Sequence, residues 1–223
     1  MTFRTIQKLL LIALLTLSAS VFSGEKINWA GPYAGLDAGY SWTRDSNGEF
    51  SNDGTPDNFF TAKNKPSGGL VGINAGYNYL LTDKWLLGLG AEFKTYNAKD
   101  TVSWGGCIYC TIKSSVENKF SLLAKAGYLI NDKTMFYVNG GWANAQIKRD
   151  FKDDYPTPPY KNWQDGWTLG AGGEYSIYQN LTAKIEYRYT DLGDKQISRP
   201  TASVYEKQSV YQNELTAGIA YHF

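Results

Sequence analysis

The carboxy-terminal residues alternate strictly between two kinds of side chain, and this pattern constrains the fold more than any other feature of the chain. The apolar set is Leu215, Ala217, Ile219, Tyr221 and Phe223, and the set between them is Glu214, Thr216, Gly218, Ala220 and His222. A period of two places the two sets on opposite faces of a β-strand. The same alternation recurs about eight times along the chain. It predicts a closed barrel with an apolar outer face toward lipid and a polar inner face.

The first 23 residues have the features of a secretory signal peptide. Two basic residues precede an apolar run over residues 9–17, and small residues follow it up to Ser23. The run is shorter than the roughly 20 residues that a membrane-spanning helix needs, which argues against an anchor. We therefore predict a signal peptide at residues 1–23 and an outer-membrane barrel domain at residues 24–223.

Composition and charge exclude several classes of protein. Without the predicted signal peptide, 20 Lys and Arg balance 21 Asp and Glu, so charge gives no argument for binding nucleic acid. Mean hydropathy is −0.39, and no later stretch has the length of a membrane helix. The 17 Tyr, 10 Phe, 7 Trp and 23 Gly favour strands that bend around a crowded lumen. A β-barrel tolerates this low hydropathy because only alternate residues face lipid.

Eight strands are expected, joined alternately by short turns and long loops. Tight turns are expected at residues 82–84, 131–134 and 179–180, and surface loops at residues 45–66, 97–114, 149–164 and 191–208. The loops are polar and have too little apolar surface to offset their ordering entropy. An even number of strands places both termini and the short turns on the periplasmic side. The predicted fold is all-β, an eight-stranded antiparallel up-and-down transmembrane β-barrel.

The predicted inner face of the strands collects charges of both signs. They are Asp37, Glu92, Glu117, Glu174, Glu186 and Glu214, with Lys94, Lys119, Lys125, Lys184 and Arg188. Charges in a narrow, poorly solvated lumen must be paired, because a lone buried ion is very costly. An eight-stranded interior is just wide enough to be filled by side chains. We therefore favour a salt-bridged core that plugs the barrel, with an ion-selective constriction as the alternative.

No catalytic or cofactor site is predicted. General acid–base chemistry by paired carboxylates needs a defined cleft and a polarised partner. The one histidine, His222, has no motif around it and is expected to be a polar residue at a strand end. We expect a protein that is not an enzyme and that has no cofactor and no metal.

The two cysteines, Cys107 and Cys110, lie in one predicted loop. An exported chain meets an oxidising compartment, so we predict a disulfide that closes a small loop. A redox role is disfavoured because no helix is expected after the motif. Zinc would need two further ligands, which the sequence does not offer. Free thiols or a metal site stay open as alternatives.

Four segments resemble a known family: residues 29–35, 166–175, 184–193 and 221–223. They are similar to the outer-membrane β-barrel family of Gram-negative bacteria, and most of all to the small immunogenic porin-like proteins of α-proteobacteria. The resemblance covers essentially the whole mature chain. The segment with Cys107 and Cys110 departs from the usual pattern.

The resemblance implies an eight-stranded barrel without catalytic residues. It also implies assembly by the outer-membrane insertion machinery, for which Tyr221 and Phe223 would be the terminal signal. Members are described as structural proteins, surface antigens, adhesins or weak porins. We predict a structural or surface-exposed role, with a narrow porin, a surface adhesin that acts through its loops and a soluble periplasmic binding barrel as alternatives.

The partners expected for such a protein follow from its place in the membrane. They are outer-membrane lipid and lipopolysaccharide, the insertion machinery, and a host or surface ligand of the loops. Nucleic acid is not expected.

Deletion of Phe223 should impair insertion more than deletion of a loop residue, because this aromatic residue ends the outer face of the closing strand. The measurement is the yield of folded protein in outer-membrane fractions. Equal yields for the two deletions would contradict the assignment of the last strand.

A disulfide between Cys107 and Cys110 should block both thiols. A thiol-alkylating mass tag should therefore label neither cysteine in unreduced protein and both after reduction. Labelling of both in unreduced protein would instead indicate free thiols.

Overall fold

The computed structural model of the protein describes residues 27–51, 56–103, 111–152, 160–198 and 204–223. The predicted signal peptide at residues 1–23 and both cysteines, Cys107 and Cys110, lie outside the described residues. Among the described residues, no helix is long and apolar enough to cross a membrane.

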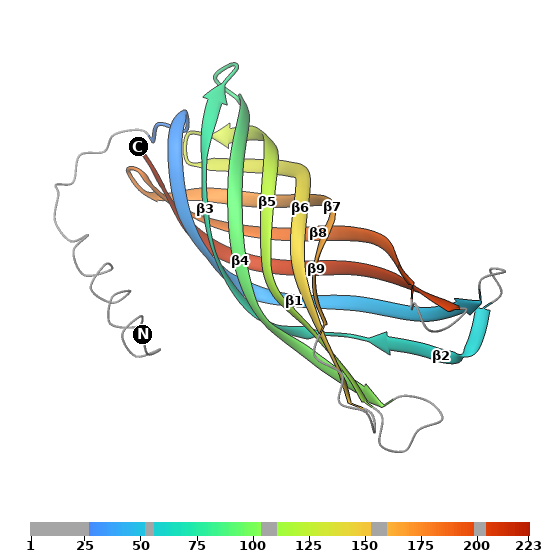
Figure 1. Ribbon diagram of the computed structural model, residues 1–223. Coiled ribbons are helices and arrows are strands. Elements are labelled where there is room, and N and C mark those ends of the chain that lie inside the picture. The colour runs from blue at the N-terminus through green and yellow to red at the C-terminus, as the bar shows by residue number, and fades with distance from the viewer. Residues whose placement is uncertain (1–26, 52–55, 104–110, 153–159, 199–203) are drawn as a thin grey trace, which may run out of the picture.

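Antiparallel strands form a single ring (Figure 1). The strands are β1 (Gly31–Ser51), β2 (Pro56–Asn64), β3 (Ser67–Leu80), β4 (Trp85–Ser103), β5 (Thr111–Asn131), β6 (Thr134–Lys152), β7 (Tyr160–Tyr178), β8 (Leu181–Ser198) and β9 (Val204–His222). Each strand from β3 to β8 pairs with the strand that follows it in the sequence, and β1 pairs with both β2 and β3. Pairing of β1 with β9, from Tyr33↔His222 to Ser51↔Val204, closes the ring.

β2 and β3 together occupy one place in the ring. β1 pairs with β3 as far as Trp42↔Ser67 and with β2 from Asp45↔Asn64 onward. Pro66 lies at the break, where its ring leaves no N–H for the ladder. The barrel therefore has eight strands, which confirms the predicted fold class.

The three tight turns lie at one end of the barrel with the carboxy terminus, and the hairpin ends lie at the other (Figure 1). At the turn end the amide of Phe223 donates a 3.0 Å hydrogen bond to the carbonyl of Pro32 on β1. The last residue thus takes part in closing the ring.

The ladders continue into all four segments that were predicted as loops. β1 extends to Ser51, β4 to Ser103, β6 to Lys152 and β8 to Ser198. Beyond the bilayer the outer face of a strand no longer has to be apolar, so the period-two hydrophobic pattern fades. The backbone hydrogen bonds of an antiparallel pair do not depend on that pattern, and they persist.

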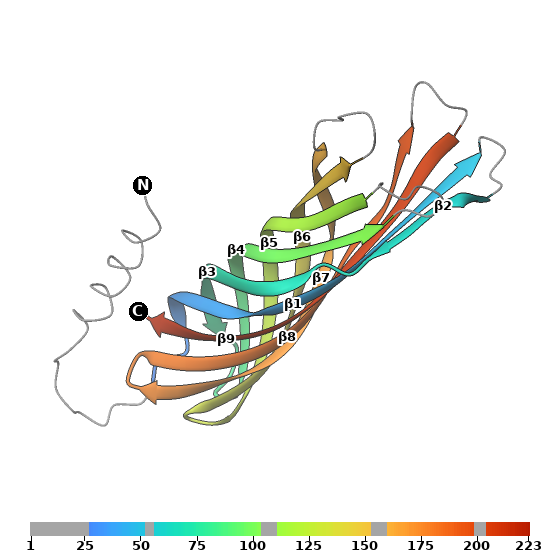
Figure 2. The same cartoon turned by 90° about the horizontal axis from the view of Figure 1, so that it is seen from below.

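Beyond the membrane the ring divides into two sheets. Pairing between β3 and β4 ends at Ser67↔Lys99, and pairing between β7 and β8 ends at Trp167↔Asp191. Past these points β8, β9, β1 and β2 continue as one sheet, and β4 to β7 continue as the other. Figure 2 shows the hairpin ends fanning out at this end.

The outer face of the barrel is apolar, with aromatic residues toward both ends. Near the turns Trp85 packs edge-on against Tyr128, with ring centres 4.9 Å apart. Near the hairpins the aromatic contacts are Trp42 with Tyr187, Trp167 with Tyr189, and Phe120 with Trp142. Two such belts are the expected arrangement at the two interfaces of a bilayer.

Candidate functional site: the charged interior

The interior holds equal numbers of acidic and basic side chains among the described residues. The acidic ones are Asp37, Asp45, Glu92, Glu174, Glu186 and Glu214, and the basic ones are Lys94, Lys119, Lys125, Arg149, Lys184 and Arg188. Each of them lies within 4.0 Å of an opposite charge. Ten of the eleven inward charges expected from the sequence are in this set.

Six of these charges form one continuous network across the middle of the barrel. In order they are Lys119, Glu214, Lys94, Glu92, Arg188 and Glu186, contributed by β4, β5, β8 and β9. Lys94 Nζ lies 3.0 Å from Glu214 and 3.1 Å from Glu92. The Arg188 guanidinium contacts Glu92 and Glu186 at 2.5 Å each. Three cations and three anions neutralise one another, so burial leaves no net charge.

Neutral groups add hydrogen bonds to the charges of this network. Tyr96 donates a 2.8 Å hydrogen bond to Glu214, and Tyr137 and Asn139 donate to Glu186 at 2.9 and 2.7 Å. Lys119 donates to Thr190 and Gln212. Buried carboxylates need such donors, since paired charge alone does not replace their hydration.

Glycine on neighbouring strands makes room for the long charged side chains. A Cβ at Gly72 would lie 2.6 Å from Cγ of Lys94, and a Cβ at Gly218 would overlap the carboxylate of Asp37. The glycine-rich inner face is thus a packing requirement of the charged core.

A second group of charges lies closer to the turns. Lys184 pairs with Asp37 at 3.0 Å, and Lys125 approaches Glu174 at 4.0 Å. Lys125 Nζ also lies 4.5 Å from the ring centre of Tyr33, within cation–π range.

His222 is buried in this second group, so it is more than the polar strand end that was expected. Its Nε2 lies 3.0 Å from Glu174, and its ring packs against Trp29 and Tyr33 at 5.4 and 5.9 Å. Only 1% of the residue is exposed. Glu174 is 3% exposed, so the pair as a whole is shielded from solvent.

A third ion pair lies toward the hairpin end and was missed from the sequence. Arg149 on β6 binds Asp45 on β1 through Nε and Nη2 at 2.8 to 3.2 Å, and Ser114 on β5 donates to the same carboxylate at 2.8 Å. The pair joins the two sheets into which the ring divides. Both charged residues fell in predicted loops. In β1 and β6 the odd-numbered residues face inward. Continuing this pattern by a few residues into the predicted loops would have placed Asp45 and Arg149 inside.

Glu117 lies outside the interior, contrary to the prediction. The β5–β6 register shifts between Val116 and Asn118, so a bulge reverses the facing of the residues before it. Val116, expected outside, is buried, and the half-exposed Glu117 pairs with exposed Lys161 at 2.6 Å. A bulge adds one residue to a strand without changing the kinds of residue in it. A prediction based on strict alternation therefore does not detect it.

Apolar layers close the interior on both sides of the charges. Toward the turns the layer consists of Ile27, Trp29, Leu86, Leu129, Met135 and Tyr137. Toward the hairpins two clusters consist of Leu70, Tyr96, Ala98 and Val116, and of Ala145, Ile147, Leu192 and Val210. An internal cavity beside Arg188 and Glu186 has a volume of only about 20 Å³, roughly the space of one water molecule.

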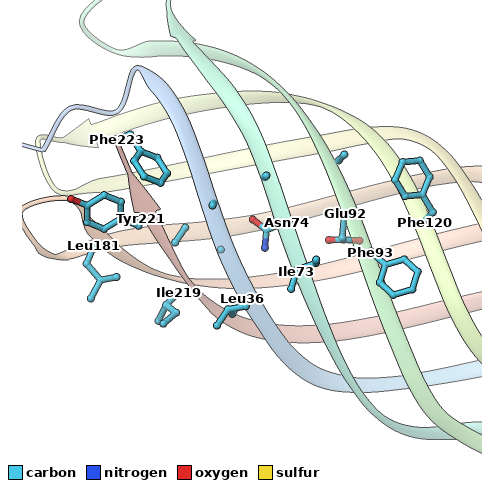
Figure 3. A pocket seen from close by; sticks show the side chains of 15 residues that line it. Leu36, Ile73, Asn74, Glu92, Phe93, Phe120, Leu181, Ile219, Tyr221 and Phe223 are labelled. Carbon is cyan, nitrogen blue, oxygen red and sulfur yellow. The ribbon is translucent and has the colours of Figure 1, made fainter. Parts of the chain in front are cut away.

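A much larger hollow, about 850 Å³, lies on the outer wall (Figure 3). Ala34, Ala75 and Ala91 line it together with larger side chains, among them Ile73 and Phe93. These are outward positions of β1, β3 and β4. The hollow is therefore mainly a feature of the apolar outer wall, and the inward residues Asn74 and Glu92 also border it.

The barrel architecture agrees with a family comparison. The model of the family described as outer membrane protein beta-barrel domain matches residues 9–223. The chain belongs to this family. Membership confirms the resemblance expected from the sequence and places the protein in the outer membrane of a Gram-negative bacterium.

Relatives of this outer-membrane barrel are named as outer-membrane immunogenic proteins. The 31 kDa outer-membrane immunogenic protein of Brucella melitensis is 31% identical over 207 residues, which cover 89% of this chain and 85% of the relative. The 25 kDa outer-membrane immunogenic protein of Brucella abortus is 28% identical and covers 99% of this chain and 100% of the relative. The crystal structure of OprG from Pseudomonas aeruginosa, 17% identical, covers 89% of this chain and 99% of OprG with a TM-score of 0.57, and shows the shared fold.

Replacement of Arg188 by Leu should destabilise the outer-membrane barrel by about 3 to 5 kcal/mol, because it leaves Glu186 buried without its cation. The measurement is the urea midpoint of unfolding in detergent micelles. Adding Glu186→Gln should restore part of the loss, since the stranded charge is then removed.

Lys161→Leu is the matched control for the Arg188 variant. It breaks a solvent-exposed ion pair and should cost no more than about 1 kcal/mol. An Arg188→Leu protein as stable as the parent would contradict a dry, paired interior.

Proposed function

We propose that the protein is a sealed, non-conducting barrel that anchors surface hairpins in the outer membrane. The observation that carries the proposal is the unbroken run of ion pairs from Lys119 to Glu186, which crosses the lumen. A pore needs a continuous water path, and an interior of this width leaves none once charged side chains fill it.

The apolar layers support the same role. Ions crossing the barrel would have to pass the cluster around Trp29 and Met135 at one end and the cluster around Ile147 and Val210 at the other. Trp29 is held in place by a 3.0 Å hydrogen bond from its indole N–H to the carbonyl of Asp132 in the β5–β6 turn. Three barriers in series, one charged and two apolar, argue against the narrow-porin alternative.

The extended hairpins support a surface role in place of transport. The ladders of β1, β2 and β4 to β9 continue past the seams where the ring divides. Outside a membrane, backbone of this kind is a scaffold that holds loops away from the lipid. An adhesin that acts through these hairpins is the second candidate, and the immunogenic character of the named relatives suits either role.

Purified protein in planar bilayers should give little or no steady conductance. A quadruple variant, Glu92→Ala and Lys94→Ala with Glu186→Ala and Arg188→Ala, removes the centre of the network and leaves Lys119 paired with Glu214 and no net charge, and it should conduct more than the parent. A heat-modifiability gel checks that each sample is folded. Large, reproducible open-channel currents from the unmodified protein would overturn the sealed-barrel role and favour the porin.

A further inference from the structure

Four exposed cations gather on the outer wall where the first seam opens. They are Arg44 on β1, Lys63 on β2, Lys65 at the β2–β3 break and Lys99 on β4. The β1 register, with Trp42↔Ser67 and Asp45↔Asn64, sets Arg44 directly across from Lys65. Lys99 pairs with Ser67, so it is a diagonal neighbour of Lys65. We refer to these four residues as the cationic patch.

The cationic patch lies at a defined depth in the membrane. Arg44 is two residues beyond Trp42, which belongs to the aromatic belt at the hairpin end. Two residues of strand span about 7 Å. Aromatic belts lie at the level of lipid head groups, so the patch lies beside the charged groups of the outer leaflet.

The cationic patch carries a net positive charge in the part of the protein that the structure describes. None of the four cations has an ion pair there, and like charges directly across a sheet are unfavourable. The carboxylate of Asp100, close to Lys65, accepts backbone hydrogen bonds from Lys65 at 2.6 Å and Thr101 at 2.9 Å. Even with Asp100 counted, the patch keeps an excess of three positive charges.

Not every exposed cation of the outer wall is left without an acidic partner. Lys161, another exposed outer-wall cation, is neutralised by Glu117 at 2.6 Å.

Arg44 is held in a fixed position. Its Nη1 donates a 3.3 Å hydrogen bond to the hydroxyl of Tyr211 on β9, and its guanidinium carbon lies 5.9 Å from the centre of that ring. This bond uses one of the five N–H donors of the Arg44 guanidinium, and the other four remain for another acceptor. A guanidinium fork matches the oxygens of a phosphate and binds them in pairs.

We propose that the cationic patch binds a phosphate of the lipid anchor of lipopolysaccharide, the glycolipid of the outer leaflet. Arg44 is the positioned ligand, and Lys65 and Lys99 supply the remaining charge. The occupant is a lipid and not a free anion, because the patch adjoins the aromatic belt and the apolar wall below it, where acyl chains lie. The site is independent of whether the lumen conducts.

The test is a titration of the folded full chain in detergent micelles with diphosphoryl lipid A, followed by native mass spectrometry. Each Lys or Arg near a lipid surface contributes about fivefold in affinity. The triple variant Arg44→Gln, Lys65→Gln, Lys99→Gln should therefore bind about a hundredfold more weakly. Tyr211→Phe should lose less, because it frees Arg44 without removing its charge.

Matched controls separate this site from general electrostatics. Lys161→Gln should bind like the parent, and lipid A stripped of its phosphates should bind all variants equally weakly. Charge-preserving Arg44→Lys with Lys65→Arg and Lys99→Arg should keep most of the affinity.

Three results would overturn the proposal. The first is undiminished binding by the triple glutamine variant, and the second is an equal loss in Lys161→Gln. The third is complete displacement of lipid A by millimolar inorganic phosphate or by a soluble polysulfated glycan, which would identify a free anion as the occupant.

Discussion

The closure of β1 onto β9 is the constraint on which the rest of the structure depends. A bilayer offers no water to backbone N–H and C=O groups, so a sheet within it must have no free edge. Closure at eight strands leaves an interior only as wide as the side chains that fill it. Residues from strands far apart in the sequence therefore meet across the lumen, as Lys119 of β5 and Glu214 of β9 do.

A charged core is the consequence of building a barrel for lipid. The outer positions must be apolar, and the inner ones are then free to be polar. Charges are accepted inside because each one finds an opposite charge. Glu186, which pairs with Arg188, also accepts hydrogen bonds from Tyr137 and Asn139. Such a core also depends on register, since a slip of one residue would turn Arg188 out to lipid and break its pairs with Glu92 and Glu186.

The same chain changes character where it leaves the membrane. The ring divides into two sheets, and the bridge from Asp45 to Arg149 holds them together across the opening. At the seam between β3 and β4 the outer wall carries its excess of positive charge. We propose that anchoring in the bilayer, contact with the lipid head groups and display of hairpins are separated along the length of the strands.

The sequence by itself determined which face of each strand meets lipid, because a period of two is a local property that needs no knowledge of partners. Leu215 to Phe223, the three short turns and the inward set that includes Glu92 and Arg188 could be predicted in this way. The tertiary structure alone decided which charges pair, where the ladders end and where the alternation breaks. Glu117 faces outward because of a bulge, and Asp45 and Arg149 face inward because hydrogen bonds to neighbouring strands carry β1 and β6 past the apolar pattern. Register between strands depends on contacts across the ring, and these do not exist until the ring is closed.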